Sequence, residues 1–182
     1  MSIGLGLGLG VGFGLFYFPN PSPSPTPNPI VYTMLLPLTV LAAFITSLLA
    51  KLLADTFITS RIAILGSFAG LQYSENPGIA FSIRFPWHLQ GIFIGVALVA
   101  LAWAAVMAKT RWSRIAFGMI LGGALANVAD RLLDGVVTDF MQVGTFPIFN
   151  VADSCITVGV AILLLEALMQ WKITKNQTSI SR

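Results

Sequence analysis

Residues 88–107 read HLQGIFIGVALVALAWAAVM, and this stretch decides the class of fold. It contains no Asp, Glu, Lys or Arg, and about 20 apolar residues form a helix long enough to cross the hydrocarbon core of a bilayer. Trp87 directly precedes it, and tryptophan concentrates at membrane–water interfaces. The stretch therefore predicts a transmembrane helix.

Three further apolar stretches of similar length lie at residues 30–53, 112–133 and 151–171. Of the 182 residues, 56% are hydrophobic and 9% are charged, whereas soluble domains carry about 25% charged residues. We therefore predict an all-α membrane protein whose four transmembrane helices pack in one domain. Small residues in the third stretch should let neighbouring helices approach closely. These residues are Gly118, Gly122, Gly123, Ala124 and Ala126.

The two ends of the chain differ from these stretches. Residues 1–29 alternate glycine with apolar residues and then proline with small polar ones, a low-complexity pattern that favours neither helix nor strand. The segment is interpreted as a tail, and a start of translation at Met34 is an alternative that the sequence leaves open. The expected organisation is a tail at 1–29, a four-helix domain at 30–172 and a cytoplasmic tail at 173–182.

Basic residues predict the orientation, because Lys and Arg accumulate in cytoplasmic loops. Six follow the second and fourth stretches with no acid among them, namely Lys109, Arg111, Arg114, Lys172, Lys175 and Arg182. Four lie at the opposite ends together with six acids, namely Lys51, Arg61, Arg84 and Arg131 with Asp55, Glu75, Asp130, Asp134, Asp139 and Asp153. Both termini are therefore expected in the cytoplasm and the acids at the outer face of a multi-pass protein.

The segment between the first two stretches is too polar to span a membrane. Its β-prone runs at 62–65 and 79–83 flank a turn signal, ENPG, at 75–78, and this pattern predicts a small sheet outside the membrane. Residues 134–149 are interpreted as a short loop. This loop should bring the end of the third helix close to the start of the fourth.

Acids beside hydrocarbon need an explanation, because an acid at the centre of a membrane helix costs about 2.5–3.5 kcal/mol on insertion. Asn127 and Arg131 are four residues apart on the third helix, and Asn150 and Asp153 are three apart at the start of the fourth. If these helix ends are adjacent, Asp139 and Asp153 meet beside two amides and a guanidinium. Two adjacent carboxylates cannot both ionise easily, so one keeps a proton and the pair can supply an acid and a base, as in aspartic proteases.

Spacing alone leaves other readings open. The pairs Asp130–Arg131 and Arg131–Asp134 would serve equally as ion pairs at a helix end, and Asp139 and Asp153 as helix caps or loop residues. An ion-coupled transporter also places acids in a membrane, although usually near mid-span, and a non-enzymatic scaffold would tolerate their replacement.

Several site classes are disfavoured by composition. The net charge of +3 comes from scattered basic residues, which disfavours nucleic acid as a partner. One cysteine, Cys155, excludes an internal disulfide, and one histidine, His88, excludes a His-rich metal site. Cysteine-protease chemistry needs a histidine base, and His88 begins a different helix from Cys155. Glu166, toward the inner end of the fourth stretch, is interpreted as a snorkelling or helix-pairing acid.

Three motifs, taken in order, carry a more specific signal. ENPGIAFSI at 75–83, GGALANVADRLLDGVVTDF at 122–140 and FPIFNVADSCITVG at 146–159 resemble those of the lipoprotein signal peptidase family, the type II signal peptidases. The family motifs are Asn-x-Gly-Ala-Ala-Phe-Ser, Gly-Gly-Ala-x-Gly-Asn-x-x-Asp-Arg followed by Val-x-Asp-Phe, and Phe-Asn-x-Ala-Asp-Ser. The resemblance covers about residues 35–172.

The resemblance implies an aspartyl endopeptidase of the bacterial inner membrane, acting as a monomer without metal or organic cofactor. Its partners would be membrane lipid and a diacylglyceryl-modified prolipoprotein, cut on the amino side of the lipidated cysteine. The matching catalytic residues are Asp139 and Asp153. The matching site-shaping residues are Asn127, Arg131 and Asn150, with Asn76 and Gly78 in an outer sheet called the β-cradle. Asp55 and Asp130 match structural polar positions.

The chain departs from the family pattern at three places. Thr59 stands where Asp-x-x-x-Lys would put lysine after Asp55, so a helix-end charge pair is expected to be missing. Pro77 and Ile79 replace small or polar residues and should stiffen the β-cradle. Ala126 replaces a glycine, which is a modest change in packing. None of these departures removes a catalytic group.

Overall fold

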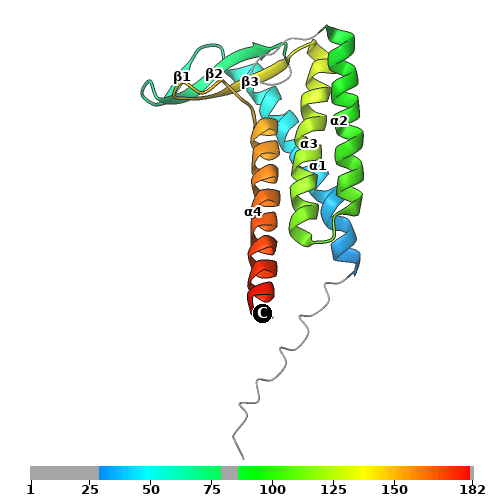
Figure 1. The fold of residues 1–182 in the computed structure, drawn as a ribbon. Helices are drawn as coiled ribbons and strands as arrows, with labels where there is room; N and C mark the ends of the chain where they lie inside the picture. The colour runs from blue at the N-terminus through cyan, green and yellow to red at the C-terminus, as the bar shows by residue number, and fades with distance from the viewer. Residues whose placement is uncertain (1–28, 79–85, 181–182) are drawn as a thin grey trace, which may run out of the picture.

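The computed structural model describes residues 29–78 and 86–180. Four long helices and three strands follow one another (Figure 1) as α1 (Pro29–Phe57), β1 (Ile62–Leu65), β2 (Ala69–Asn76), α2 (Trp87–Met107), α3 (Arg111–Asp134), β3 (Val137–Val143) and α4 (Val151–Ile180). All four helices are long and apolar enough to cross a membrane. The four predicted spans are therefore confirmed. Of the tail predicted at 1–29, residues 1–28 lie outside the described residues, and Pro29 is the first residue of α1.

Helix α3 is the central helix of the bundle. It packs against α1, α4 and, less extensively, α2, and its mean hydropathy of 1.3 is the lowest of the four helices because it carries the polar residues of the site. The side chain of Thr110 accepts a hydrogen bond from the Ser113 amide and caps its first turn. Gly135 ends the helix in the left-handed conformation, at φ 78°, which glycine adopts without strain.

Glycines form the seams between the helices, as the small residues of the third stretch predicted. A β-carbon on Gly122 would meet the Val40 carbonyl of α1, and one on Gly123 would lie 2.5 Å from the Ala152 carbonyl oxygen of α4. Ala126, which replaces the family glycine, is also buried. The start of α4 is thus held directly against α3.

Gly123→Ala is expected to destabilise the folded protein by about 1–3 kcal/mol, because the new methyl group overpacks a seam that has no room for it. The matched control is Gly95→Ala on α2, where a β-carbon would meet nothing within 4 Å. The control should cause no loss of stability. Thermal unfolding in detergent measures both, and equal stability of the two variants would contradict the assigned seam.

The three strands form one antiparallel sheet in the order β1-β2-β3, at the end of the helices where α4 begins (Figure 1). The strand predicted at 62–65 is confirmed, but its partner is β2, which already contains Glu75 and Asn76 of the expected turn. The chain instead turns at residues 66–68. The other predicted strand, at 79–83, lies outside the described residues.

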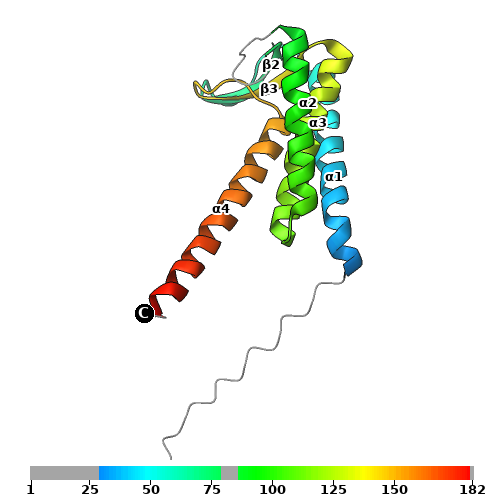
Figure 2. The ribbon, with the colours of Figure 1, turned by 45° about the vertical axis from the view of Figure 1, so that its right-hand side comes forward.

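One further prediction from the sequence was wrong. Residues 134–149 are not only a loop, because they contain β3, which pairs with β2. The first four residues of β3 are all buried, so its sequence lacks the alternation that reveals a half-exposed strand. The span predicted at 151–171 agrees with the apolar part of α4, Val151–Lys172, and the helix itself continues to Ile180. It diverges from the other helices toward that end (Figure 2).

Candidate active site

The residues that the sequence assigned to the site meet where the sheet joins the helices. Asp139 lies on β3 and Asp153 in the first turn of α4. Both line one cavity of about 800 Å³, together with Asn76 of β2 and Asn127 and Arg131 of α3. The remaining two, Gly78 and Asn150, are hydrogen-bonded to this group. All seven positions are thus brought together from four elements and the turn after β2.

Asp153 is positioned by the capping of α4. The side-chain oxygen of Asn150 accepts a hydrogen bond from the Asp153 amide at 2.9 Å, and Asp153 Oδ2 accepts one from the Asn150 amide at 3.2 Å. This reciprocal arrangement is a capping box with aspartate in the place usually taken by glutamate. The cap reading of Asp153 is therefore correct, and the cap holds its carboxylate at the cavity.

The amide of Asn150 also connects the two carboxylates. Its Nδ2 donates to Asp139 Oδ1 at 2.9 Å and to Asn127 Oδ1 at 3.0 Å. Asn127 Nδ2 in turn donates to Asp153 Oδ1 at 2.9 Å. The two asparagines thus connect the two aspartates through a continuous chain of hydrogen bonds. Asn150 is only 5% exposed, so water does not compete freely for these bonds.

Asp139 is held from both neighbouring elements. Asn76 on the adjacent strand donates to Asp139 Oδ2 at 3.0 Å, opposite the bond from Asn150. Burial raises the pKa of the Asp139 carboxyl to about 6; the hydrogen bond from Asn76 lowers the pKa, and the nearby Asp153 carboxylate raises it. A carboxyl with a pKa this close to neutrality exchanges a proton readily and suits acid–base chemistry.

Arg131 faces the same cavity and forms neither of the two ion pairs considered from the sequence. Its Nη2 donates to the Gly78 carbonyl at 2.6 Å, and its Nη1 donates to the Asn127 carbonyl at 3.2 Å. Its buried Nε has no hydrogen-bond partner in the described part of the chain. The guanidinium therefore carries a spare donor near the two aspartates.

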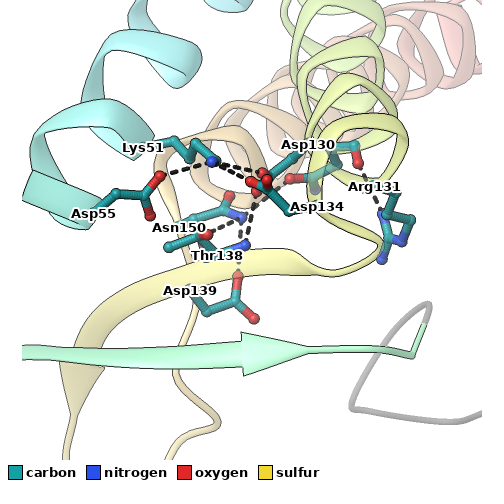
Figure 3. Close-up of polar contacts among 9 residues, drawn as sticks. Lys51, Asp55, Asp130, Arg131, Asp134, Thr138, Asp139 and Asn150 are labelled. Carbon is teal, nitrogen blue, oxygen red and sulfur yellow. Dashed lines mark hydrogen bonds and ion pairs between the residues drawn. The ribbon is translucent and has the colours of Figure 1, made fainter.

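Lys51 on α1 pairs with the acids that Arg131 does not contact. Figure 3 shows its ammonium between Asp55, Asp130 and Asp134, with Nζ–O distances of 2.6, 3.3 and 2.5 Å, respectively. The expectation that Thr59 leaves a helix-end charge pair missing was therefore wrong. The pair is made one turn before Asp55 instead of one turn after it. The i,i+4 spacing of Lys51 and Asp55 was the signal that could have revealed it.

Two other residues considered from the sequence, Glu166 and Cys155, lie on α4. Glu166 accepts a hydrogen bond from the Ser113 hydroxyl at 2.6 Å and so joins α4 to α3, which agrees with a helix-pairing acid. Cys155 is a half-buried free thiol on α4. Within residues 29–78 and 86–180, no three His, Cys, Asp or Glu side chains form a cluster that would hold a metal ion.

The walls of the cavity are mainly apolar beyond its polar end. They are formed by residues of α2, α3 and α4 and by the segment after β3, including Ile94, Leu98, Ile156, Val158 and Phe146. The cavity therefore combines two carboxylates and several donors with a hydrocarbon-like surface. A ligand with a polar reacting group and a long apolar part matches this combination.

Known proteins that are similar to this chain are named signal peptidases. The family model for signal peptidase (SPase) II matches residues 39–169. The lipoprotein signal peptidase of Dehalococcoides mccartyi is 41% identical over 130 residues, which cover 65% of this chain and 81% of that protein. The lipoprotein signal peptidase of Chlorobaculum tepidum is 36% identical over 146 residues, covering 70% and 90%.

A solved structure agrees with the sequence matches. A bacterial membrane enzyme determined by the in meso method at 2.3 Å resolution superposes with a TM-score of 0.65 at 28% identity, covering 72% of this chain and 86% of that one. The family model covers well over half of the chain, and the curated relatives and this structure agree with it. On these grounds the chain belongs to the signal peptidase II family of aspartic membrane proteases.

Proposed function

We propose that this protein removes signal peptides from diacylglyceryl-modified bacterial prolipoproteins by cutting on the amino side of the lipidated cysteine. The observation that carries the proposal is the position of Asp139 and Asp153 at the polar end of one large, mainly apolar cavity. Relatives that match the chain over most of its helical domain are named lipoprotein signal peptidases. The apolar walls provide a surface for the acyl chains and the signal peptide.

The proposed chemistry uses the two aspartates as a pair that shares one proton. The ionised carboxylate takes a proton from water while the water oxygen attacks the carbonyl carbon of the scissile peptide, and the protonated carboxyl donates to the carbonyl oxygen. The carboxyl that took the proton from water then donates it to the amide nitrogen, and the C–N bond breaks. The products are a signal peptide with a new carboxylate and a lipoprotein with a free amino group on its cysteine. Because the carboxyls interact, the pair titrates as a unit.

Five neighbouring residues are assigned supporting roles. Asn127 and Asn150 orient the carboxylates through the continuous chain of hydrogen bonds that connects them. Arg131 has a spare donor at Nε, and a guanidinium is suited to bind carbonyl oxygens of the substrate backbone. Asn76 and Gly78 would hold the substrate against the β-cradle, the three-stranded sheet β1–β3.

The proposed orientation places both termini in the cytoplasm and the site near the outer face of the inner membrane. The described chain begins and ends on the side opposite the sheet (Figure 1), and the unopposed basic residues lie on that side of the helices. We take residues 30–172 as the catalytic unit, between the two tails proposed from the sequence. We take the monomer as the active form, because the catalytic groups all come from one chain.

Cleavage by purified protein tests the proposal. The substrate is a prolipoprotein carrying diacylglycerol on its cysteine, and the matched control is the same chain without the lipid. Cleavage of the lipidated form, with a product mass that begins at the modified cysteine, is the expected result. Equal cleavage of both forms would contradict the assigned substrate class, and cleavage of neither by folded protein would contradict the assigned activity.

Asn76→Ala is expected to move the alkaline limb of the pH profile of kcat/KM upward by about one pH unit. The hydrogen bond from Asn76 stabilises the ionised form of Asp139, and a bond to a charged group is worth about 1.5–3 kcal/mol. Its loss raises the pKa of Asp139, so the pair keeps its shared proton to a higher pH. Since the pKa of Asp139 in the wild type is about 6, the alkaline limb of the wild-type profile should begin near this pH.

The test compares the pH profiles of kcat/KM for the wild type, Asn76→Ala and a control variant. Gln72→Ala is the control, because Gln72 is exposed on the same strand. The control should match the wild type. If the alkaline limb of Asn76→Ala lay at the same pH as that of the wild type, the pKa of Asp139 would not determine this limb.

A further inference from the structure

We infer that Lys51, which does not line the active-site cavity, is a positioning residue for cleavage: it fixes Asp130, and Asp130 fixes the strand that carries Asp139. The inference rests on the proposed function and extends it to a lysine on α1 that the sequence analysis did not assign to the site. It starts from three contacts that run in sequence from α1 through α3 to β3.

The first contact is between Lys51 and Asp130. Asp130 is 3% exposed, and its Oδ1 lies 3.3 Å from Lys51 Nζ. In the described part of the chain this oxygen has no hydrogen-bond partner, so the ammonium is the group that compensates its charge. Removing this partner would leave an uncompensated buried charge, which strongly disfavours the present arrangement.

The second contact is between Asp130 and the start of β3. Its Oδ2 accepts a hydrogen bond from the Thr138 amide at 2.7 Å. Thr138 is itself only 2% exposed and immediately precedes Asp139. An ionised carboxylate is the stronger acceptor, so the charge on Asp130, which Lys51 maintains, holds this amide in place.

The third connection is through the backbone of β3. Asn150 Nδ2 lies 3.4 Å from the Thr138 carbonyl and 2.9 Å from Asp139 Oδ1. A small rotation of the Thr138 peptide therefore shifts Asp139 relative to its amide partners. Misplacement of a catalytic group by about 1 Å can reduce the rate about 10²-fold. Figure 3 shows the connected groups, with Lys51 and Asp139 on opposite sides of Thr138 and Asn150.

Asp134 provides a matched control within the same cluster. Its carboxylate also contacts Lys51, at 2.5 Å, but its side chain is 47% exposed and lies at the end of α3, before the capping residue Gly135. If Lys51 served only to join the ends of α1 and α3, loss of the charge at Asp134 would matter as much as loss of the charge at Asp130.

The experiment compares kcat and KM of full-length variants on the lipidated prolipoprotein, per mole of folded enzyme. Lys51→Met is expected to lower kcat about 10-fold or more with KM within about twofold, because Lys51 is not among the residues lining the cavity. Lys51→Arg should keep most of the activity, since it retains the charge. Asp134→Asn should leave kcat within about twofold of wild type.

A double variant separates positioning from folding. In Lys51→Met/Asp130→Asn the buried charge is gone, but the asparagine oxygen still accepts the Thr138 amide. This variant should recover kcat relative to Lys51→Met, and it also serves if Lys51→Met alone does not fold. Equal losses of kcat for Lys51→Met and Asp134→Asn, or no recovery in the double variant, would overturn the inference.

The outcomes also separate this inference from the proposed function. Cleavage by wild type that stops in Asp139→Asn but continues unchanged in Lys51→Met contradicts only the role of Lys51. Cleavage that continues in Asp139→Asn contradicts the proposed mechanism, whatever Lys51→Met does.

Discussion

Asp139→Asn and Asp153→Asn are each expected to reduce kcat for prolipoprotein cleavage by about 10²- to 10⁴-fold, the range typical of losing a general acid or base. An asparagine at either position can neither take a proton from water nor return one to the leaving nitrogen. Both aspartates line the cavity and are linked through Asn127 and Asn150. Combining the substitutions should cost little more than one alone, because the two groups act as a unit.

The control for this prediction is Asp134→Asn, which also neutralises an acid near the ends of the helices. Asp134 contacts Lys51 and does not line the cavity, so its variant should cleave like the wild type. Thermal unfolding of each variant in detergent shows whether it is folded. Folded Asp139→Asn and Asp153→Asn proteins that cleave at the wild-type rate would remove the two aspartates from the mechanism.

Much of the fold could be predicted because a membrane imposes simple requirements. A helix that satisfies its own backbone needs about 20 apolar residues to cross, and such stretches are visible in the sequence without an alignment. The buried position of α3 could also be anticipated from Gly118, Gly122 and Gly123, which meet α1 and α4. These features depend on local sequence.

The strand that carries Asp139 could not be predicted in the same way. Residues 137–140 are covered on both sides, so they show no alternation of polar and apolar side chains. The register that places Ser74 opposite Asp139 depends on contacts between segments more than 60 positions apart. The hydrogen bond from Asn76 to Asp139, which depends on this register, was likewise hidden.

The role of Lys51 was missed for a different reason. The resemblance directs attention to Thr59, the position after Asp55 where a lysine is usual, and so suggests a lost charge pair. On a helix, residues four positions before and four positions after Asp55 are both its neighbours. Lys51 satisfies Asp55 from the other side and also reaches Asp130 and Asp134 of α3. Motif matching depends on the position of a residue in the sequence, whereas an ion pair requires only that the two charged side chains lie close together.

Asn150 combines two functions that substitutions can separate. Its Oδ1 caps α4 by accepting from the Asp153 amide, and its Nδ2 donates to Asp139 and Asn127. Serine keeps a side-chain acceptor suited to an N-cap but has no group that reaches both partners. Alanine has neither. The cap is worth about 1 kcal/mol, whereas the hydrogen bonds from Nδ2 connect Asp139 to Asn127.

Asn150→Ser and Asn150→Ala are therefore expected to lose similar activity, about 10²-fold in kcat, but to differ in stability by about 1 kcal/mol in favour of serine. Steady-state cleavage and thermal unfolding of the same preparations measure the two effects separately. If activity followed stability, so that Asn150→Ser cleaved nearly as well as wild type, the amide bridge would be dispensable and the cap alone would position Asp153. Loss of activity in a stably capped Asn150→Ser protein would instead mean that the hydrogen bonds between the carboxylates are required in addition to the helix start that supports them.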